Sequence, residues 1–223
     1  MPISAKPETL VKQLLARRLR QRIMNGKLRP GDRVVENKWA KEFGVAQASI
    51  REAINLLIQD GFLTKADGRS ARVTNLSEQD VLKLYELRGA LEGLAARRAA
   101  ELSADITPLK EALTRMRAAA RRGDAEELLD ADLAFHLALA AASGNHYVVE
   151  QAERILIPFF AFVRIRVVAG DKGTAAWNRD LEVHRRIVDL IKDGDGDVVE
   201  RFMQHAMSRF AATAYENWEK SSS

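Results

Sequence analysis

The chain has 223 residues, of which 47% are hydrophobic and 30% charged, a balance that excludes a disordered protein and allows one or two globular domains. The absence of cysteine excludes disulfides, thiolate zinc fingers, iron–sulfur clusters and cysteine nucleophiles. Residues 1–74 carry 15 basic against 7 acidic side chains, whereas the remaining residues have a net charge of −4. The longest apolar run, residues 155–163, is too short to span a membrane, and residues 1–10 lack the apolar core of a signal peptide. We therefore expect a cytoplasmic protein.

The N-terminal part begins with an expected amphipathic helix over Glu8–Met24. Two shorter helices follow between Lys38 and Leu57, and Gly44 stands at the tight turn between them, where a left-handed backbone is favoured. Apolar residues at helical spacing in the second short helix would pack it across the first. This is the pattern of a helix-turn-helix, whose second helix can enter the major groove of DNA.

A hairpin is predicted after these helices. Residues 61–64 and 71–74 favour extended structure and flank the turn Asp67-Gly68-Arg69-Ser70. Together with the helices they predict a winged helix-turn-helix domain over residues 1–75. The excess of positive charge in this part is what binding to DNA phosphates requires. The alternative for the arginines of the first helix is that they only solvate its exposed face; these are Arg17, Arg18, Arg20 and Arg22.

Residues 76–223 are predicted to form an all-helical antiparallel bundle, because no strand-like alternation occurs in them. Ser77 and Asp80 have the spacing of a helix N-cap. Pro158 is expected to kink or split the fourth helix. The six helices are expected near residues 77–101, 104–121, 124–142, 146–169, 175–193 and 197–219. The fold class is thus mainly α, a winged helix-turn-helix followed by a helical effector domain.

Four polar residues lie on helix stripes that are otherwise apolar. Asp132 and His136 are four residues apart and therefore project from one side of their helix. His184 interrupts an apolar row, and His205 lies at the edge of another. Burying these groups bare would cost several kcal/mol, which a bound divalent cation would remove. The set predicts a metal site of one carboxylate and three imidazoles; the alternative is that each histidine is separately hydrogen-bonded in the core.

Arg88 stands beside the apolar face of the first bundle helix. A guanidinium that faces the bundle interior near a metal is suited to binding a carboxylate through two hydrogen bonds. We therefore take Arg88 as the candidate residue for binding a carboxylate ligand. The alternative is a salt bridge with Glu92, one helical turn away.

With both parts considered, the chain resembles the GntR family of transcriptional regulators, in the FadR-like branch with the FCD effector domain. In the N-terminal part the resemblance rests on Val35-Glu36, Trp39-Ala40, Phe43-Gly44-Val45 and Ile50-Arg51-Glu52-Ala53-Ile54. In the C-terminal part it rests on Leu87-Arg88, Leu91-Glu92, Asp132, Phe135-His136, Ser143-Gly144-Asn145, His184 and His205. The six expected helices match the six-helix, VanR-like form of the domain.

The resemblance implies a repressor or activator that binds a palindromic double-stranded operator as a homodimer and a small organic acid in its helical domain. It also implies a divalent metal ion, zinc or nickel before others, held by Asp132, His136, His184 and His205. The DNA contacts expected by resemblance are Glu36, Asn37, Gln47, Ser49, Arg51, Gly68 and Arg69. Gln47 stands where the family commonly has arginine. Arginine there would read guanine, whereas Gln47 favours adenine or softer contacts.

The functional hypothesis is DNA binding controlled by a carboxylate effector at or near the metal, without catalysis. Two alternatives stay open: the metal itself is the signal, or the helical domain is a metal-dependent enzyme fused to a DNA-binding module. A purely structural metal is a further possibility. The sequence leaves the effector, the operator sequence and the regulated genes undetermined.

Overall fold

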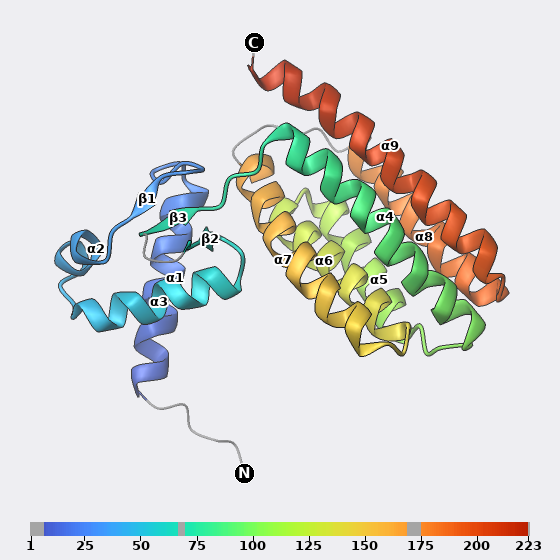
Figure 1. Cartoon of the computed structure of the whole chain (residues 1–223), viewed down its shortest axis with the longest axis horizontal. Coiled ribbons are helices and arrows are strands. Elements are labelled where there is room, and N and C mark those ends of the chain that lie inside the picture. The colour runs from blue at the N-terminus through green and yellow to red at the C-terminus, as the bar shows by residue number, and fades with distance from the viewer. Residues whose placement is uncertain (1–6, 67–69, 169–174, 223) are drawn as a thin grey trace. The chain divides into compact units, whose positions relative to one another are not determined.

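The computed structural model describes residues 7–66, 70–168 and 175–222 (Figure 1). Its contacts divide the chain into two compact units. The first runs to Asn75 and also includes a segment that begins at Ala161, and the second begins at Leu76 and comprises the rest. The candidate metal ligands all belong to the second unit.

The first unit contains the predicted helix-turn-helix. Its helices are α1 (Pro7–Met24), α2 (Glu36–Phe43) and α3 (Gln47–Gln59). Helix α2 ends at Gly44, whose φ of 66° is in the left-handed region that glycine adopts without steric cost. The turn places the N-terminus of α3 three residues after Gly44, as the spacing predicts.

A three-stranded antiparallel sheet completes this unit. Its strands are β1 (Arg33–Val34), β2 (Leu63–Thr64) and β3 (Ala71–Val73), in the order β1-β3-β2. In the register, Arg33 pairs with Arg72, and Leu63 pairs with Val73. The β2–β3 hairpin was predicted as the wing, whereas β1 was not, because two residues are too few to show an alternation.

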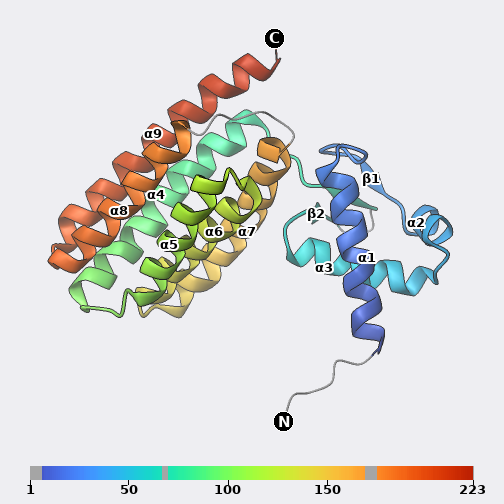
Figure 2. The same ribbon diagram turned by 180° about the vertical axis from the view of Figure 1, so that it is seen from behind.

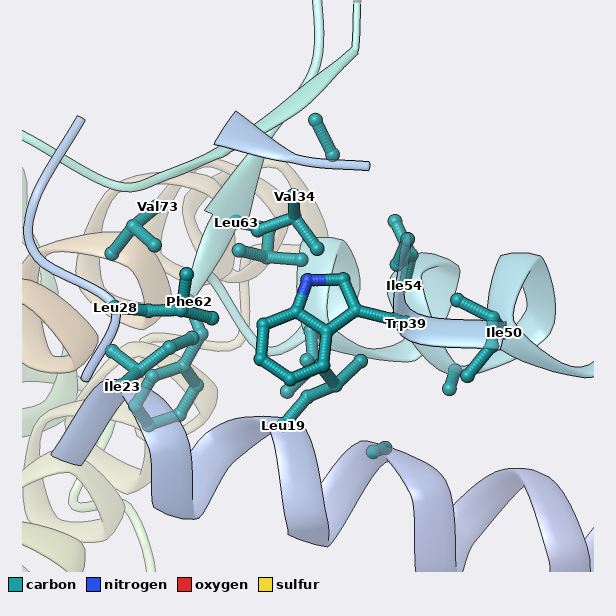
Figure 3. Close-up of a cluster of buried hydrophobic side chains, with 14 of the residues drawn as sticks. Leu19, Ile23, Leu28, Val34, Trp39, Ile50, Ile54, Phe62, Leu63 and Val73 are labelled. Carbon is teal, nitrogen blue, oxygen red and sulfur yellow. The ribbon is translucent and has the colours of Figure 1, made fainter. Parts of the chain in front are cut away.

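Trp39 lies in the centre of the core of the first unit. Its side chain is 4% exposed and is surrounded by apolar residues from α1, α3 and the sheet, among them Leu19, Ile54, Val34 and Leu63 (Figure 3). This packing of one large aromatic ring against three elements fixes α3 relative to α1 and leaves the outer side of α3 free.

The second unit is a bundle of long helices, as predicted. They are α4 (Glu78–Glu101), α5 (Thr107–Arg122), α6 (Ala125–Ala142), α7 (His146–Val168), α8 (Ala175–Asp193) and α9 (Gly196–Ser222). Helices α4 and α9 lie side by side over much of their length, as do α5 and α6 (Figures 1 and 2). Helix α4 begins with the predicted cap: the Ser77 hydroxyl accepts from the Asp80 backbone N–H, and the Asp80 carboxylate accepts from the Ser77 backbone N–H.

Two local expectations differ from the structure. Helix α5 begins at Thr107, not at 104, because Pro108 occupies its first turn and the Asp105 side chain accepts from the Thr107 N–H. Pro158 does not split α7, which is a single helix through that position. Buried neighbours such as Phe159 and Phe160 pack in the bundle and offset the backbone hydrogen bond that proline cannot make.

Within the described ranges, every strand lies before Asn75, and no helix has the length and apolarity needed to cross a membrane.

Candidate functional site

Three of the four predicted metal ligands meet inside the bundle. Asp132 and His136 project from adjacent turns of α6, and His184 approaches them from α8. His184 Nε2 lies 3.0 Å from Asp132 Oδ1 and 3.4 Å from His136 Nε2, and the distance from His136 Nε2 to Asp132 Oδ1 is 3.2 Å. Both histidines are 3% exposed, while the Asp132 side chain retains 21% exposure.

The opposite ring nitrogen of each histidine faces an oxygen atom, in a hydrogen bond for His184 and in an ion-pair contact for His136. His184 Nδ1 donates to the backbone carbonyl of Asp180 at 2.6 Å. His136 Nδ1 lies directly against Glu92 Oε2. Because both oxygens can only accept, the neutral form of each ring carries its proton on Nδ1 and presents the Nε2 lone pair to the centre of the site.

Three electron-pair donors therefore face one another at 3.0–3.4 Å. Such an arrangement is repulsive unless a proton or a metal ion lies between the atoms. An ion with bonds of about 2.1 Å separates its ligand atoms by roughly 3.4 Å in a tetrahedron and roughly 3.0 Å in an octahedron. The observed spacing fits both, so the residues present are suited to a divalent cation.

The fourth predicted ligand, His205, does not join this group in the described part of the chain. Among the described residues, the group of possible ligands within 4.8 Å comprises Asp132, His136 and His184 alone. His205 is exposed on α9, whereas the next two residues, Ala206 and Met207, are buried. Successive residues of a helix differ in direction by about 100°, so a histidine at the edge of an apolar stripe can lie on the outer face.

Arg88 reaches the same site from α4. Its Nε donates to Glu92 Oε1 at 2.7 Å, which is the salt bridge weighed as the alternative, and its Nη2 lies 3.2 Å from His136 Nε2. The guanidinium carbon lies 4.8–5.4 Å from the ring centres of Tyr85, Phe159 and Phe160. The side chain is thus a buried cation in an aromatic cage, at the edge of the donor set.

The charges in this site strongly shift the pKa values of its members. Burial would raise the pKa of Glu92, but Arg88 and His136 outweigh it and hold that pKa at about 2. Burial likewise opposes ionisation of Asp132, yet His184 and His136 keep its pKa below the usual range. Burial alone would lower the pKa of His136. The neighbouring Glu92 carboxylate outweighs this effect, so the pKa of His136 is raised. A metal ion would therefore compete with a proton at His136.

Two parts of this site were not predicted as functional. Glu92 was considered only as a partner of Arg88, and its contact with His136 joins residues that are far apart in the sequence. The aromatic cage combines α4 with α7, and nothing in the spacing of Tyr85, Phe159 and Phe160 indicates that they meet.

The predicted DNA-contact residues gather around the N-terminus of α3. Glu36, the first residue of α2, accepts from Gln47 Nε2 at 2.9 Å and from Arg51 Nη2 at 3.0 Å. Gln47 and Arg51 are exposed one turn apart on α3. Hydrogen bonds from Arg51 and Gln47 lower the pKa of Glu36. The structure thus brings these three residues together on one exposed surface.

The other DNA candidates are located less specifically. Asn37 is exposed on the first turn of α2, and Ser49 is partly buried in the first turn of α3. Gly68 and Arg69 lie outside the described residues. Two of the α1 arginines form ion pairs, Arg20 with Asp60 and Arg22 with Glu42.

Comparison with protein-family models identifies both halves of the chain. Residues 12–73 match the model of bacterial regulatory proteins of the gntR family, and residues 83–209 match the FCD domain. The first match covers the helix-turn-helix and wing, and the second covers all the candidate metal ligands and Arg88.

Curated relatives and solved structures agree with this assignment. The chain is 30% identical over 195 residues to a protein named uncharacterized HTH-type transcriptional regulator YdhC of Bacillus subtilis (strain 168), covering 86% of this chain and 84% of that protein. It is 26% identical to a gluconate operon transcriptional repressor of Bacillus licheniformis, covering 81% and 75%.

Solved structures share the fold. A GntR transcriptional regulator from Rhodococcus sp. RHA1 superposes with a TM-score of 0.70 at 22% identity, covering 91% of this chain and 96% of that one. E. coli McbR/YncC gives 0.69 at 20% identity, covering 93% and 98%. The chain therefore belongs to the GntR family of bacterial transcriptional regulators and carries an FCD domain.

Proposed function

We propose that the protein is a cytoplasmic transcriptional repressor whose affinity for operator DNA is controlled by a small carboxylate effector. The effector would bind at or near a divalent metal ion in the FCD domain. The observation that carries the metal is the convergence of Asp132 Oδ1 with the Nε2 atoms of His136 and His184 while both Nδ1 atoms are already occupied. A repressor role is supported by relatives named as operon repressors.

Asp132, His136 and His184 would hold the ion, with zinc or nickel as the first candidates. When bound, the ion would supply a Lewis-acidic point to which an effector carboxylate can attach. Three protein ligands leave coordination positions for such a group, whereas four would close a tetrahedral site. His205 was predicted as a fourth ligand, and the variant experiment below tests whether it takes part.

Arg88 would bind the effector carboxylate. Its Nε is already engaged by Glu92, so the Nη groups, one of which points toward His136 Nε2, are the ones available to a ligand. The aromatic cage fixes the guanidinium plane, and burial strengthens a charge-assisted hydrogen bond. We therefore expect the carboxylate to bind between Arg88 and the ion.

The DNA-binding form would be a homodimer on a palindromic operator, with Gln47 and Arg51 of each protomer directed at base edges and phosphates. Helix α4 offers a surface for the second copy: Leu87 and Leu94, seven residues apart, are 48% and 39% exposed. Size-exclusion chromatography with light scattering on the wild type and Leu87→Lys tests this assignment, and a wild-type monomer at micromolar concentration would contradict it.

Metal content tests the centre of the proposal. Mass spectrometry of the purified protein should find about one equivalent of metal ion per chain. The variants His136→Ala and His184→Ala should lose this metal. His205→Ala should keep the metal, because this side chain is exposed and outside the donor group. Loss of metal in His205→Ala would reinstate His205 as a ligand, and no metal in the wild type after reloading would refute the site.

Regulation is tested with a duplex selected from a random library. Added carboxylates should lower the affinity of the metal-loaded protein for this duplex. A 100-fold change in that affinity corresponds to about 2.7 kcal/mol of coupling free energy between the two sites. The effector should be recovered unchanged, because the protein is proposed to sense it and not to convert it. If metal alone altered DNA binding and no carboxylate did, the ion itself would be the signal.

A further inference from the structure

Glu92 is the one carboxylate in this site that no proposed ligand set uses. It lies on α4, is 1% exposed, and directs one oxygen at Arg88 on the same helix and the other at His136 on α6. Oε1 accepts from Arg88 Nε at 2.7 Å, and Oε2 lies against His136 Nδ1. A buried anion of this kind is costly unless each oxygen has a partner, and here both do.

The contact with His136 has a chemical consequence. An acceptor on Nδ1 forces the ring proton to that nitrogen and directs the Nε2 lone pair toward Asp132 and His184. A carboxylate in this position also increases the basicity of the imidazole and fixes the ring plane. Asp180 does the same for His184 through its backbone carbonyl, but a backbone group cannot be removed by substitution.

On the basis of the proposed metal site, we propose that Glu92 is a positioning residue. It sets the tautomer and orientation of His136, and it holds Arg88 with its other oxygen, so that one side chain prepares both the metal ligand and the guanidinium. An amide cannot replace it. Glutamine offers one oxygen and one –NH₂ group, so either the Arg88 Nε–H or the His136 Nδ1–H would face a donor.

The chain contains a matched control on the same helix. Arg97 Nε donates to Glu101 Oε1 at 2.8 Å, again with a spacing of four residues. The two side chains are 42% and 48% exposed. Glu101→Gln therefore removes the same charge from an exposed pair on the same helix, away from the metal site, and leaves Arg97 its other partners, Asp197 and Glu200.

The test compares Ni²⁺ affinity and histidine tautomers in the wild type, Glu92→Gln and Glu101→Gln. Competition with a chelator should show that Glu92→Gln weakens Ni²⁺ binding by roughly 10- to 100-fold, and that Glu101→Gln leaves it unchanged. Long-range ¹H–¹⁵N NMR of the metal-free protein at alkaline pH should find the His136 proton on Nδ1 in the wild type and distributed over both nitrogens in Glu92→Gln.

The outcomes separate the two proposals. Wild-type protein that binds no Ni²⁺ would overturn the metal site and this inference with it. Wild-type protein that binds Ni²⁺, with Glu92→Gln equal to it in affinity and tautomer, would overturn the role of Glu92 and leave the metal site standing. If Glu92→Gln failed to fold, the wild-type spectrum would still decide, because a His136 proton on Nε2 contradicts positioning by Glu92.

Discussion

The Arg88–Glu92 pair gives a quantitative prediction about stability. Both side chains are almost fully buried, at 4% and 1% exposure, and their hydrogen bond is 2.7 Å long. The appropriate perturbation is a double-mutant cycle with Arg88→Met and Glu92→Leu, singly and together. Methionine can fill the aromatic cage around the guanidinium without introducing a charge.

Each single substitution leaves one buried charge without its main partner. Breaking such a pair costs about 3–5 kcal/mol, which is roughly 6–20 °C in the melting temperature of a domain of this size. The double variant removes both charges, so its cost should fall to about 1–3 kcal/mol, because His136 Nδ1 still loses its acceptor. The coupling energy should therefore be at least about 3 kcal/mol.

The assay is chemical and thermal unfolding in the presence of a chelator, so that metal binding does not contribute. The exposed Arg97–Glu101 pair serves as the control cycle, and its coupling should be only about 0.3–0.5 kcal/mol. The description of this pair as a desolvated unit would be refuted by either of two results. Each single substitution would cost less than about 1 kcal/mol of stability, or the two costs would simply add in the double variant.

Four further changes test other parts of the molecule. Ser77→Ala removes the capping box of α4 and should lower the free energy of unfolding by about 0.5–2 kcal/mol in denaturant titrations. Gly196→Ala would place a Cβ 3.1 Å from a backbone oxygen of α4, so calorimetry should show destabilisation of about 1–3 kcal/mol. The hydrogen bond from Arg51 lowers the pKa of Glu36 below its usual 4.5. Its contribution to stability is therefore complete above pH 4.5 and declines as the pH falls through the lower folded-state pKa; melting curves of Glu36→Gln should lack this decline. Selection from random duplexes should show that Gln47→Arg shifts base preference from adenine toward guanine.

The sequence was sufficient for most of the fold, because the signals were local. Gly44 marks the turn between α2 and α3, and the glycines at 123 and 194 follow helices that end there, with φ values of 68° and 81°. Of the two expectations at Pro158, a kink or a split, the split is absent, because burial of the surrounding helix outweighs one missing hydrogen bond. Strand β1 could not be predicted, since its pairing with β3 depends on residues far along the chain.

The site was predictable only where one helix determines it. Asp132 and His136 share a face because they are four residues apart, and His184 stands inside an apolar row. His205 shows the limit of this reasoning: a rotation of one residue separates a buried from an exposed side chain, and periodicity does not resolve that angle at the edge of a stripe. The contact of Glu92 with His136 depends on how α4 packs on α6, and the spacing of residues within one helix gives no information on that packing.

The two candidate sites use the same arrangement at different depths. In each, one glutamate accepts from two donors that have roles of their own: Glu36 from Gln47 and Arg51, and Glu92 from Arg88 and His136. Glu92 is 1% exposed, so its contacts are shielded from water and its partners are held strongly. The Glu36 side chain is 21% exposed and its partner Arg51 is 55% exposed, so water and salt weaken those bonds. In the proposed function, the donors of α3 would therefore be released to DNA at little cost, whereas Arg88 and His136 would stay in place for a ligand. This difference in burial suits the first site to frequent exchange of partners and the second to selective sensing.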